Sequence, residues 1–457
     1  MSSTIKRNKY EIDMCNGTIM DKLISFSLPL MLSGILQLMF NAVDIIVIGR
    51  FSGSQSLAAV GSTTALINMF TNLFIGISLG ANVLSARFYA AGKDKEMSET
   101  VHTAITLALI SGIIMVFVGL IFAKPVLELM DTPDDVINLS TLYMRIYFMG
   151  MPFFMLYNYG ASILRAVGDT KRPLFYLIVA GIANAGLNMC LVIIFHLGVA
   201  GVAIGTVISQ LISSILVLRC LYQSETSYQL RFSKLKIQKE YLKQIFQVGI
   251  PAGIQSTVIN FSNVLLQSSV NSFESIAMAG YTAANNIFGF LYVTVNAVTQ
   301  ACMSFTSQNY GVGKWKRMDR VLIDCLILSF VAMMILGNSA YFFGPKLLTI
   351  YTSNSKVIQC GMEILLYTTV TYFLCGFMDL FPGALRGMGR SGVPMILSII
   401  GTVGTRIVWI FWIFPNHRSL DILFISYPAS WIITIVLQVI CYYFVRKQLY
   451  AKMRAEA

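Results

Sequence analysis

The sequence predicts an all-α polytopic membrane protein with twelve transmembrane helices in two pseudo-symmetric six-helix lobes. Hydrophobic residues make up 56% of the 457 residues, charged residues only 12%, and the mean hydropathy is +0.71. A soluble fold of this length would expose more polar surface than this composition supplies. The chain also repeats itself, because LRAVGDTKRP at Leu164 to Pro173 returns as LRGMGRSGVP at Leu385 to Pro394.

Each predicted helix is an apolar stretch long enough to cross a hydrocarbon core of roughly 30 Å. Six such stretches fall in the first half, at about 24–49, 58–86, 101–123, 136–160, 173–195 and 198–219. Six more mirror them in the second half, at about 245–270, 277–307, 321–343, 357–384, 393–415 and 421–445. Because the count is even, both ends of the chain are expected on one side of the membrane.

The repeat sets the expected domain organisation. YAAGK at 89–93 matches YGVGK at 310–314, and Pro29 matches Pro251. We therefore expect an N-terminal lobe at 1–222, a basic linker at 223–243, and a C-terminal lobe with a tail at 244–457. The linker's spacing fits either an amphipathic helix on the inner leaflet or a solvated tether. Duplicated helical bundles with a site near the interface of their halves are a recurring transporter design.

Most of the 33 Lys and Arg residues fall in loops on the side of the termini. Cytoplasmic loops of membrane proteins carry this excess, so we expect both termini to be cytoplasmic in a cell (plasma) membrane. The net charge of +12 follows largely from the same bias. Anionic lipid headgroups are therefore the expected counter-charge, and nucleic acid is not an expected partner.

Cysteine and histidine usage argues against metal chemistry. The eight cysteines are scattered without CxxC spacing, and the three histidines, His102, His196 and His417, lie far apart. We expect reduced cysteines, no metal, no cofactor and no catalytic residues. A membrane enzyme would need clustered acids or histidines at one interface, so the sequence does not predict an enzyme.

The candidate functional residues are the polar ones inside helices, because an ionisable group in the membrane is costly. Gln37, Asn41 and Asp44 fall at i, i+4 and i+7, on one helix face. Asp44 has no basic neighbour on its helix, so it must be protonated, bind a cation or contact water. Amides on the second and fifth predicted helices could complete a polar cavity: Asn68, Asn72, Asn184 and Asn188. For the amides taken singly, we favour plain interhelical hydrogen bonding.

The second half differs in its polar residues. Its first helix carries no carboxylate, only Asn260, Asn263 and Gln267. The C-terminal lobe instead holds Asp379 and, on the next helix, Arg406, while Asn158 occupies the place of Asp379 in the first half. We expect Asp379 and Arg406 to form a polar pair. A structural role is favoured over a functional one, because a paired carboxylate is poorly available to a travelling ion.

Three features together resemble the multidrug and toxic compound extrusion (MATE) transporters. They are SLPLMLSGILQLMFNAVDIIVIG at 27–49, the LRAVGDTKRP and LRGMGRSGVP pair, and NAGLNMCLVIIFHLGVAGVAIGTVISQ at 184–210. The resemblance covers essentially the full chain. It implies a V-shaped pair of six-helix lobes and export of amphipathic, often cationic drugs and dyes in exchange for H⁺ or Na⁺.

The resemblance also assigns roles to residues. Asp44 matches the first-helix aspartate that binds the coupling ion in this family, and Asn184 matches an amide beside it. Where the family often has NxxLDP this chain has NAGLNM, so Asn188 and Met189 replace the second aspartate and the proline. We expect a coupling-ion site of Asp44, Asn41, Asn184 and Asn188.

The expected substrate cavity combines polar and apolar side chains. Its candidates are Gln37, Met39, Phe40, Asn68, Asn72, Tyr157, Asn158, Tyr159, Asn263 and Phe288. Methionine and aromatic side chains suit varied flat cations. Lipid-facing packing is an equally simple role for each aromatic residue.

The function predicted from the sequence is therefore a secondary active multidrug efflux antiporter that works by alternating access. The alternative is a flippase for a lipid-linked or polyprenyl substrate. The coupling ion remains open between H⁺ and Na⁺, and a working monomer is expected.

Overall fold

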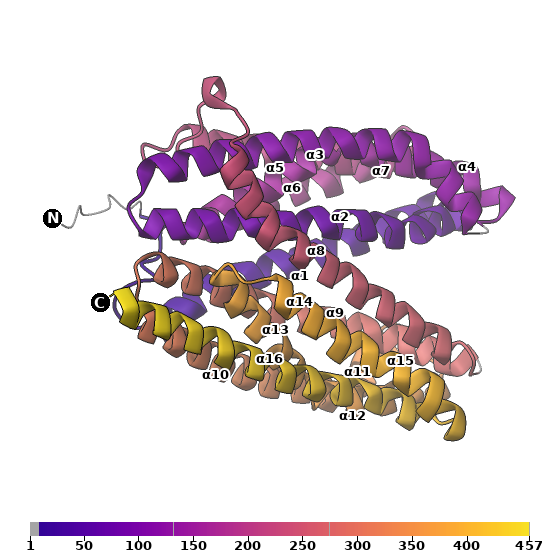
Figure 1. The fold of residues 1–457 in the computed structure, drawn as a ribbon. Coiled ribbons are helices and arrows are strands. Elements are labelled where there is room, and N and C mark those ends of the chain that lie inside the picture. The colour runs from indigo at the N-terminus through magenta and orange to yellow at the C-terminus, as the bar shows by residue number, and fades with distance from the viewer. Residues whose placement is uncertain (1–8, 131, 274, 457) are drawn as a thin grey trace. The chain divides into compact units, whose positions relative to one another are not determined.

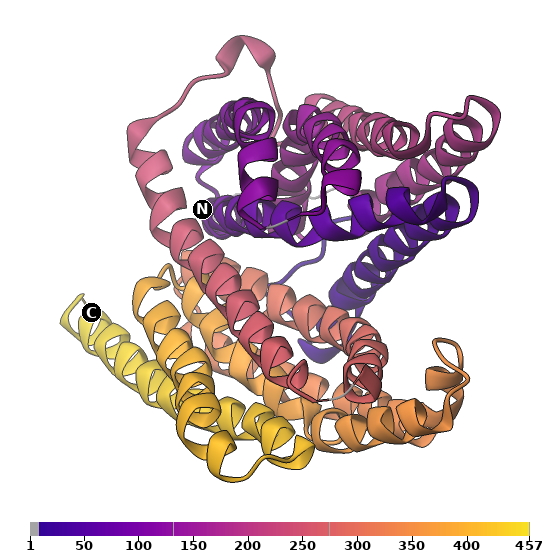
Figure 2. The same ribbon diagram turned by 90° about the vertical axis from the view of Figure 1, so that its right-hand side faces the viewer.

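The computed structural model describes residues 9–130, 132–273 and 275–456. Helices occupy all twelve predicted stretches, which confirms the fold class (Figure 1 and Figure 2). In the first half these are α1 (Met20–Phe51), α2 (Gly53–Ala90), α3 (Asp94–Leu129), α4 (Asp134–Met149), α5 (Met151–Ala166), α6 (Lys171–Met189) with the π-helical η1 (Cys190–Ile194), and α7 (Gly198–Tyr222).

In the second half the helices follow in the same order. They are α8 (Lys239–Val270), α9 (Ser275–Gly311), α10 (Trp315–Phe342), α11 (Gly344–Thr349), α12 (Ser355–Thr369), α13 (Tyr372–Gly387), α14 (Gly392–Ser398), α15 (Thr405–Val408) and α16 (Leu420–Glu456). Two π-helical segments, η3 (Ile399–Gly404) and η4 (Trp409–Ile413), flank α15, and the 3₁₀ turn η5 (Phe414–Asn416) follows.

Within the described residues, nine helical spans are long and apolar enough to cross a membrane by themselves. A tenth forms when α12 and α13 are counted together across a bend of 43°. The other two predicted stretches are helical as well, as α4 with α5 and as α8, but they do not meet this criterion.

The chain forms two compact units. Unit 1 contains 1–13 and 28–253, and unit 2 contains 14–27 and 254–457. Each unit has its own hydrophobic core. Helix α1 therefore begins in unit 2 and ends in unit 1, whereas α8 begins in unit 1 and ends in unit 2.

The repeated LRAVGD and LRGMGR sequences make the same helix stop in each unit. Gly168 has φ +97° and Gly389 has φ +79°, a region that side chains other than glycine rarely adopt. The next amides, of Asp169 and Arg390, donate to the carbonyl oxygens of Leu164 and Leu385, both at 2.9 Å. This is the pattern by which a left-handed glycine ends a helix.

Glycines also let α2 and α8 approach closely inside unit 1. Gly76 and Gly80 on α2 face Gly249 and Gly253 on α8, and a Cβ at any of the four would meet backbone atoms of the other helix. Two small residues four apart on each helix permit such backbone contact.

Before α8 begins at Lys239, the linker is neither an amphipathic helix nor a solvated tether. Its helical content before α8 is the 3₁₀ turn η2 (Phe232–Lys234). Tyr228 and Leu230 are fully buried, and the backbone amide of Arg231 donates to Nε2 of His102 at 3.0 Å. The segment is docked on unit 1 because its apolar side chains and backbone find partners on α3 and α7.

Candidate functional site

Asp44 lies at the centre of a buried polar cluster in unit 1. Its side chain is 9% exposed, and its Oδ1 accepts a hydrogen bond of 2.5 Å from Nδ2 of Asn188. The same Nδ2 lies 3.3 Å from Oδ1 of Asn184, whose own Nδ2 donates to Thr206 Oγ1 at 3.4 Å. The Thr206 hydroxyl lies near Asp44 and donates to the carbonyl oxygen of Val202 at 3.0 Å. The structure thus brings together three of the four predicted coupling-site residues.

Three helices build this cluster. Asp44 comes from α1, Asn184 and Asn188 lie one turn apart on α6, and Thr206 comes from α7. Gly205 makes room, because a Cβ there would collide with the Asn188 side chain. Just after Asn188 the helix widens into the π-helical η1. Such π-bulges frequently occur at functional sites.

Two features of the cluster bear on its chemistry. Among the described residues, no Lys or Arg forms an ion pair with Asp44, so its charge is balanced only by neutral donors. Oδ1 of Asn188 is buried and has no hydrogen-bond partner in the described part of the chain. A buried carboxylate and an unused buried acceptor therefore lie side by side.

Sequence reasoning missed the residues that α4 and α7 contribute. Tyr143 and Tyr147 on α4 lie near enough to Asp44 for its charge to act on them, and Gln210 on α7 lies beside Tyr147. A signal was present, since the two tyrosines are four residues apart in a predicted helix. Thr206 gave none, because isolated threonines are common in membrane helices.

The remaining polar candidates of unit 1 do not join the cluster. Gln37, Asn41 and Asn68 are exposed, and Asn72 is half-buried. Asn158 is half-buried and donates to the carbonyl oxygen of Phe154, on its own helix, at 2.8 Å. Asn41 shares a helix face with Asp44, as predicted, but its role in binding an ion stays a prediction.

The apolar candidates of unit 1 divide into surface and core. Met39 is 51% exposed, and the ring of Phe40 packs where Gly181 on α6 has no side chain. Tyr159 is fully buried, and Tyr157 is 5% exposed with its hydroxyl donating to the carbonyl oxygen of Pro173. This placement favours a packing role for the two tyrosines.

In unit 2 the expected Asp379–Arg406 pair is wrong. Among the described residues the two form no ion pair; Arg406 Nη1 donates to Oδ1 of Asn263 at 2.7 Å and to Ser262 at 3.3 Å. The guanidinium also lies over the ring of Tyr427, 4.6 Å from its centroid. The π-helical segments on both sides of α15 change the helical register, which directs Arg406 toward α8.

The charged group that acts on Asp379 is Arg386, about two helix turns along α13. Arg386 in turn donates from Nη2 to Oε1 of the buried Gln255, at 2.7 Å. Phe288, a predicted cavity residue, is 7% exposed and stacks on Tyr372. Of the two predicted cavity residues in unit 2, Asn263 hydrogen-bonds the guanidinium of Arg406, whereas Phe288 packs on an aromatic ring.

The sequence and the fold both match known proteins. The sequence model of a family described as MatE matches residues 29–190 and 251–412, once in each half. The chain is 29% identical to the probable multidrug resistance protein YoeA of Bacillus subtilis (strain 168), over 93% of both chains. It is 23% identical to the multidrug export protein MepA of Staphylococcus aureus (strain NCTC 8325 / PS 47), over 83% of this chain and 84% of MepA.

Two solved structures share the fold. A crystal structure of MATE in complex with MaL6 has a TM-score of 0.89 at 20% identity, covering 98% of this chain and 100% of that one. A MOP superfamily transporter from Pyrococcus furiosus has a TM-score of 0.87 at 20% identity, covering 98% and 99%. At such identities the likeness concerns the fold alone.

Proposed function

The chain belongs to the MatE family, the multidrug and toxic compound extrusion transporters, and from this premise we propose that it is a secondary active antiporter. It exports amphipathic, often cationic compounds in exchange for an ion, by alternating access. The single observation that carries the proposal is the buried cluster of Asp44, Asn188, Asn184 and Thr206. It holds one exchangeable negative charge that no Lys or Arg pairs with in the described part of the chain.

The donors around Asp44 support H⁺ over Na⁺ as the coupling ion. Asn188 presents its Nδ2 to the carboxylate, and an N–H donor stabilises the anion without ligating a metal cation. A hard cation needs several oxygen ligands. Protonation of Asp44 creates a new O–H donor, and a turn of the Asn188 amide would offer it the unused Oδ1.

The ion and the substrate are exchanged because they favour opposite conformations. A ligand shifts a conformational equilibrium only by its differential affinity for the two states. Protonation from outside would favour the state that releases the compound. Reopening inward would release the proton into the cytoplasm and admit new substrate.

In this proposal both termini are cytoplasmic and the protein works as a monomer in the plasma membrane. The charge bias of the loops supports the orientation. The related proteins YoeA and MepA are named for multidrug resistance and export, so the lipid flippase alternative is not favoured.

The test is ethidium efflux from proteoliposomes under an imposed pH gradient or an imposed Na⁺ gradient. Wild-type protein is expected to export under the pH gradient, and Asp44→Asn is expected to remain folded but lose gradient-driven export. Glu128→Gln, which neutralises an exposed carboxylate paired with Lys124, is the matched control and should export normally. Normal export by Asp44→Asn would refute the proposal, and transport under the Na⁺ gradient alone would replace H⁺ by Na⁺.

A further inference from the structure

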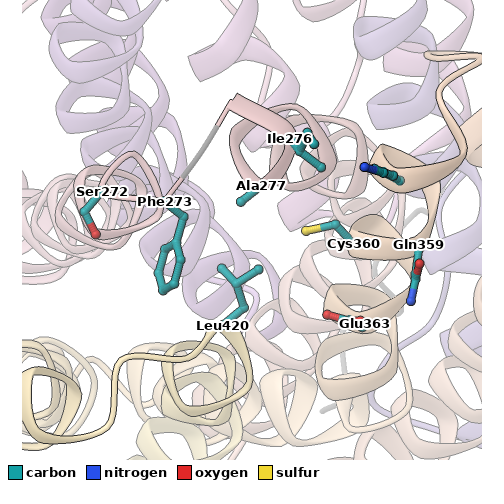
Figure 3. A pocket seen from close by; sticks show the side chains of 9 residues that line it. Ser272, Phe273, Ile276, Ala277, Gln359, Cys360, Glu363 and Leu420 are labelled. Atoms are coloured by element: carbon teal, nitrogen blue, oxygen red, sulfur yellow. The ribbon is translucent and has the colours of Figure 1, made fainter.

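A pocket of about 490 Å³ lies at one end of unit 2, far along the chain from the Asp44 cluster. Ser272 and Phe273 beyond the end of α8, the first turn of α9, the first turns of α12 and the start of α16 meet there (Figure 3). Pockets that bind small molecules have volumes of roughly 300–1,000 Å³. Its volume therefore falls within the range of small-molecule sites.

One side of the pocket is apolar. Phe273, Ile276 and Leu420 are half-buried, and Ala277 is 6% exposed. The ring of Phe273 is held by Phe414, with 5.8 Å between ring centroids. In Figure 3 this side faces the sulfur of Cys360 and the carboxylate of Glu363. A flat apolar body would lie against a wall that is already in place.

The opposite side carries two charges of opposite sign on one helix. Lys356 and Glu363 are seven residues apart on α12, so they share a face and stand about 10 Å apart along the helix axis. Both are exposed, and among the described residues neither has an ion-pair partner. Cys360 lies between them and is 7% exposed.

We propose that this pocket binds a zwitterionic aromatic compound. Its ammonium group would contact Glu363, its carboxylate would contact Lys356, and its rings would pack against Phe273, Ile276 and Leu420. A simple organic cation fits less well, because Lys356 repels it from the same wall. A phosphatidylethanolamine headgroup carries its two charges too close together to reach both residues. The inference does not depend on Asp44 or on the proposed ion coupling.

Equilibrium binding to the purified full-length protein in nanodiscs tests the charge pattern. The probe is 4′-(aminomethyl)biphenyl-4-carboxylate, whose charges are separated by the length of the rings. Its methyl ester keeps only the cation, and 4′-methylbiphenyl-4-carboxylate keeps only the anion. We expect the zwitterion to bind more tightly than either, by about fivefold for each exposed charge contact.

Charge-neutral variants separate the two contacts. Glu363→Gln should weaken binding of the zwitterion and the ester about fivefold and should not weaken binding of the anion. Lys356→Gln should weaken binding of the zwitterion and the anion about fivefold and should not weaken binding of the ester. Lys346→Gln and Glu128→Gln, exposed charges outside the pocket, are the matched controls and should change nothing. Equal affinity for the three compounds, or no saturable binding, would overturn the proposal.

Cys360 can show where the probe sits, since it lines the pocket. Alkylation of this thiol by iodoacetamide, followed by peptide mass spectrometry, should slow when the zwitterion is bound, in wild type and in Asp44→Asn alike. Ala277→Leu fills the pocket and should abolish the binding that depends on Glu363. Saturable binding that survives Ala277→Leu with unchanged affinity would place the ligand elsewhere and refute the assignment, even if Cys360 proves unreactive.

Discussion

At the scale of single residues, two amides that were both predicted to belong to the coupling-ion site have different surroundings. Asn188 is fully buried and donates to Asp44, whereas Asn41 is exposed. Asn188→Leu leaves a buried carboxylate without its donor and should lower the free energy of unfolding by about 1–3 kcal/mol. Asn41→Leu should change it by less than about 0.5 kcal/mol. Thermal unfolding of both variants in detergent measures the two losses of stability. Equal losses would mean that the Asp44–Asn188 contact contributes nothing beyond what an exposed amide contributes.

The partners of Arg406 lead to a second residue-scale prediction. Its hydrogen bonds to Ser262 and Asn263 place its interaction energy on α8 rather than on Asp379. A double-mutant cycle of Arg406→Met with Asn263→Leu should show a coupling energy of about 0.5–3 kcal/mol. The matching cycle of Arg406→Met with Asp379→Asn should show nearly none. A larger coupling in the Asp379 cycle would restore the pair that the sequence suggested.

These residues also show how far the site could be predicted from the sequence. Periodicity placed Asn184 and Asn188 on one helix face, and the resemblance placed that face against Asp44, where the structure has it. The side on which Arg406 emerges could not be predicted, because the π-helical η3 and η4 shift a register that a regular helix would keep. Nothing in the sequence singled out Thr206, since its role depends on which helix lies beside α1.

At the scale of elements, the contact of α2 with α8 depends on missing side chains. A Cβ at Gly80 would meet the backbone at Ile245, so Gly80→Ala should push the helices apart and cost about 1–3 kcal/mol. Gly61, on the same helix, has open space around it, so Gly61→Ala should instead stabilise the protein by about 0.5–1 kcal/mol. Thermal unfolding should thus give shifts of opposite sign. Shifts of the same sign would show that backbone contact does not limit the packing.

The segment before α1 is held to unit 1 by two tyrosines. Glu11 accepts hydrogen bonds from the hydroxyls of Tyr89 at 2.6 Å and Tyr228 at 2.7 Å. Burial, and then the hydrogen bond to Glu11 and the negative charge of that carboxylate, raise the pKa of Tyr228. The hydroxyl therefore stays protonated at neutral pH, and its contribution to stability is lost only as the pH rises through that raised pKa.

Removal of one hydroxyl should loosen this segment. In Tyr228→Phe, the Ile12 amide, which bonds the carbonyl oxygen of Gly168, should exchange its hydrogen about tenfold faster, as loss of about 1.4 kcal/mol implies. Tyr222→Phe is the matched control, because Tyr222 is exposed and keeps its stacking on Phe232. Hydrogen exchange by mass spectrometry measures both variants, and equal protection in the two would show that Tyr228 does not hold the segment.

At the scale of the whole molecule, the fold was predictable because the signals were long and repeated. Apolar stretches of membrane length and a duplicated helix stop at Gly168 and Gly389 identify twelve helices in two copies. The compact units were not predictable from the same signals. Hydropathy marks where a helix lies in the chain, but it carries no record that the first turns of α1 pack in unit 2 and the first half of α8 in unit 1.

Because α1 and α8 each pass from one unit to the other, the two matched prolines can be located relative to the unit boundaries. Pro29 lies one residue beyond the unit boundary in α1, and Pro251 lies two residues before the boundary in α8. Only α1, α8 and the segment before α1 pass from one unit to the other, so motion between the units must be absorbed there. A proline inside a helix removes a backbone hydrogen bond and weakens the helix by about 3 kcal/mol or more, which makes each boundary easier to bend.

Replacing these prolines should therefore separate stability from transport. Pro29→Ala and Pro251→Ala regain a backbone hydrogen bond, so unfolding should need equal or higher temperature, while ethidium export should slow about tenfold if bending contributes about 1.4 kcal/mol to the barrier. Pro125→Ala in α3, a helix confined to unit 1, is the matched control and should export at the wild-type rate. Unchanged export in the boundary variants, or an equal loss in the control, would locate the flexible step outside α1 and α8.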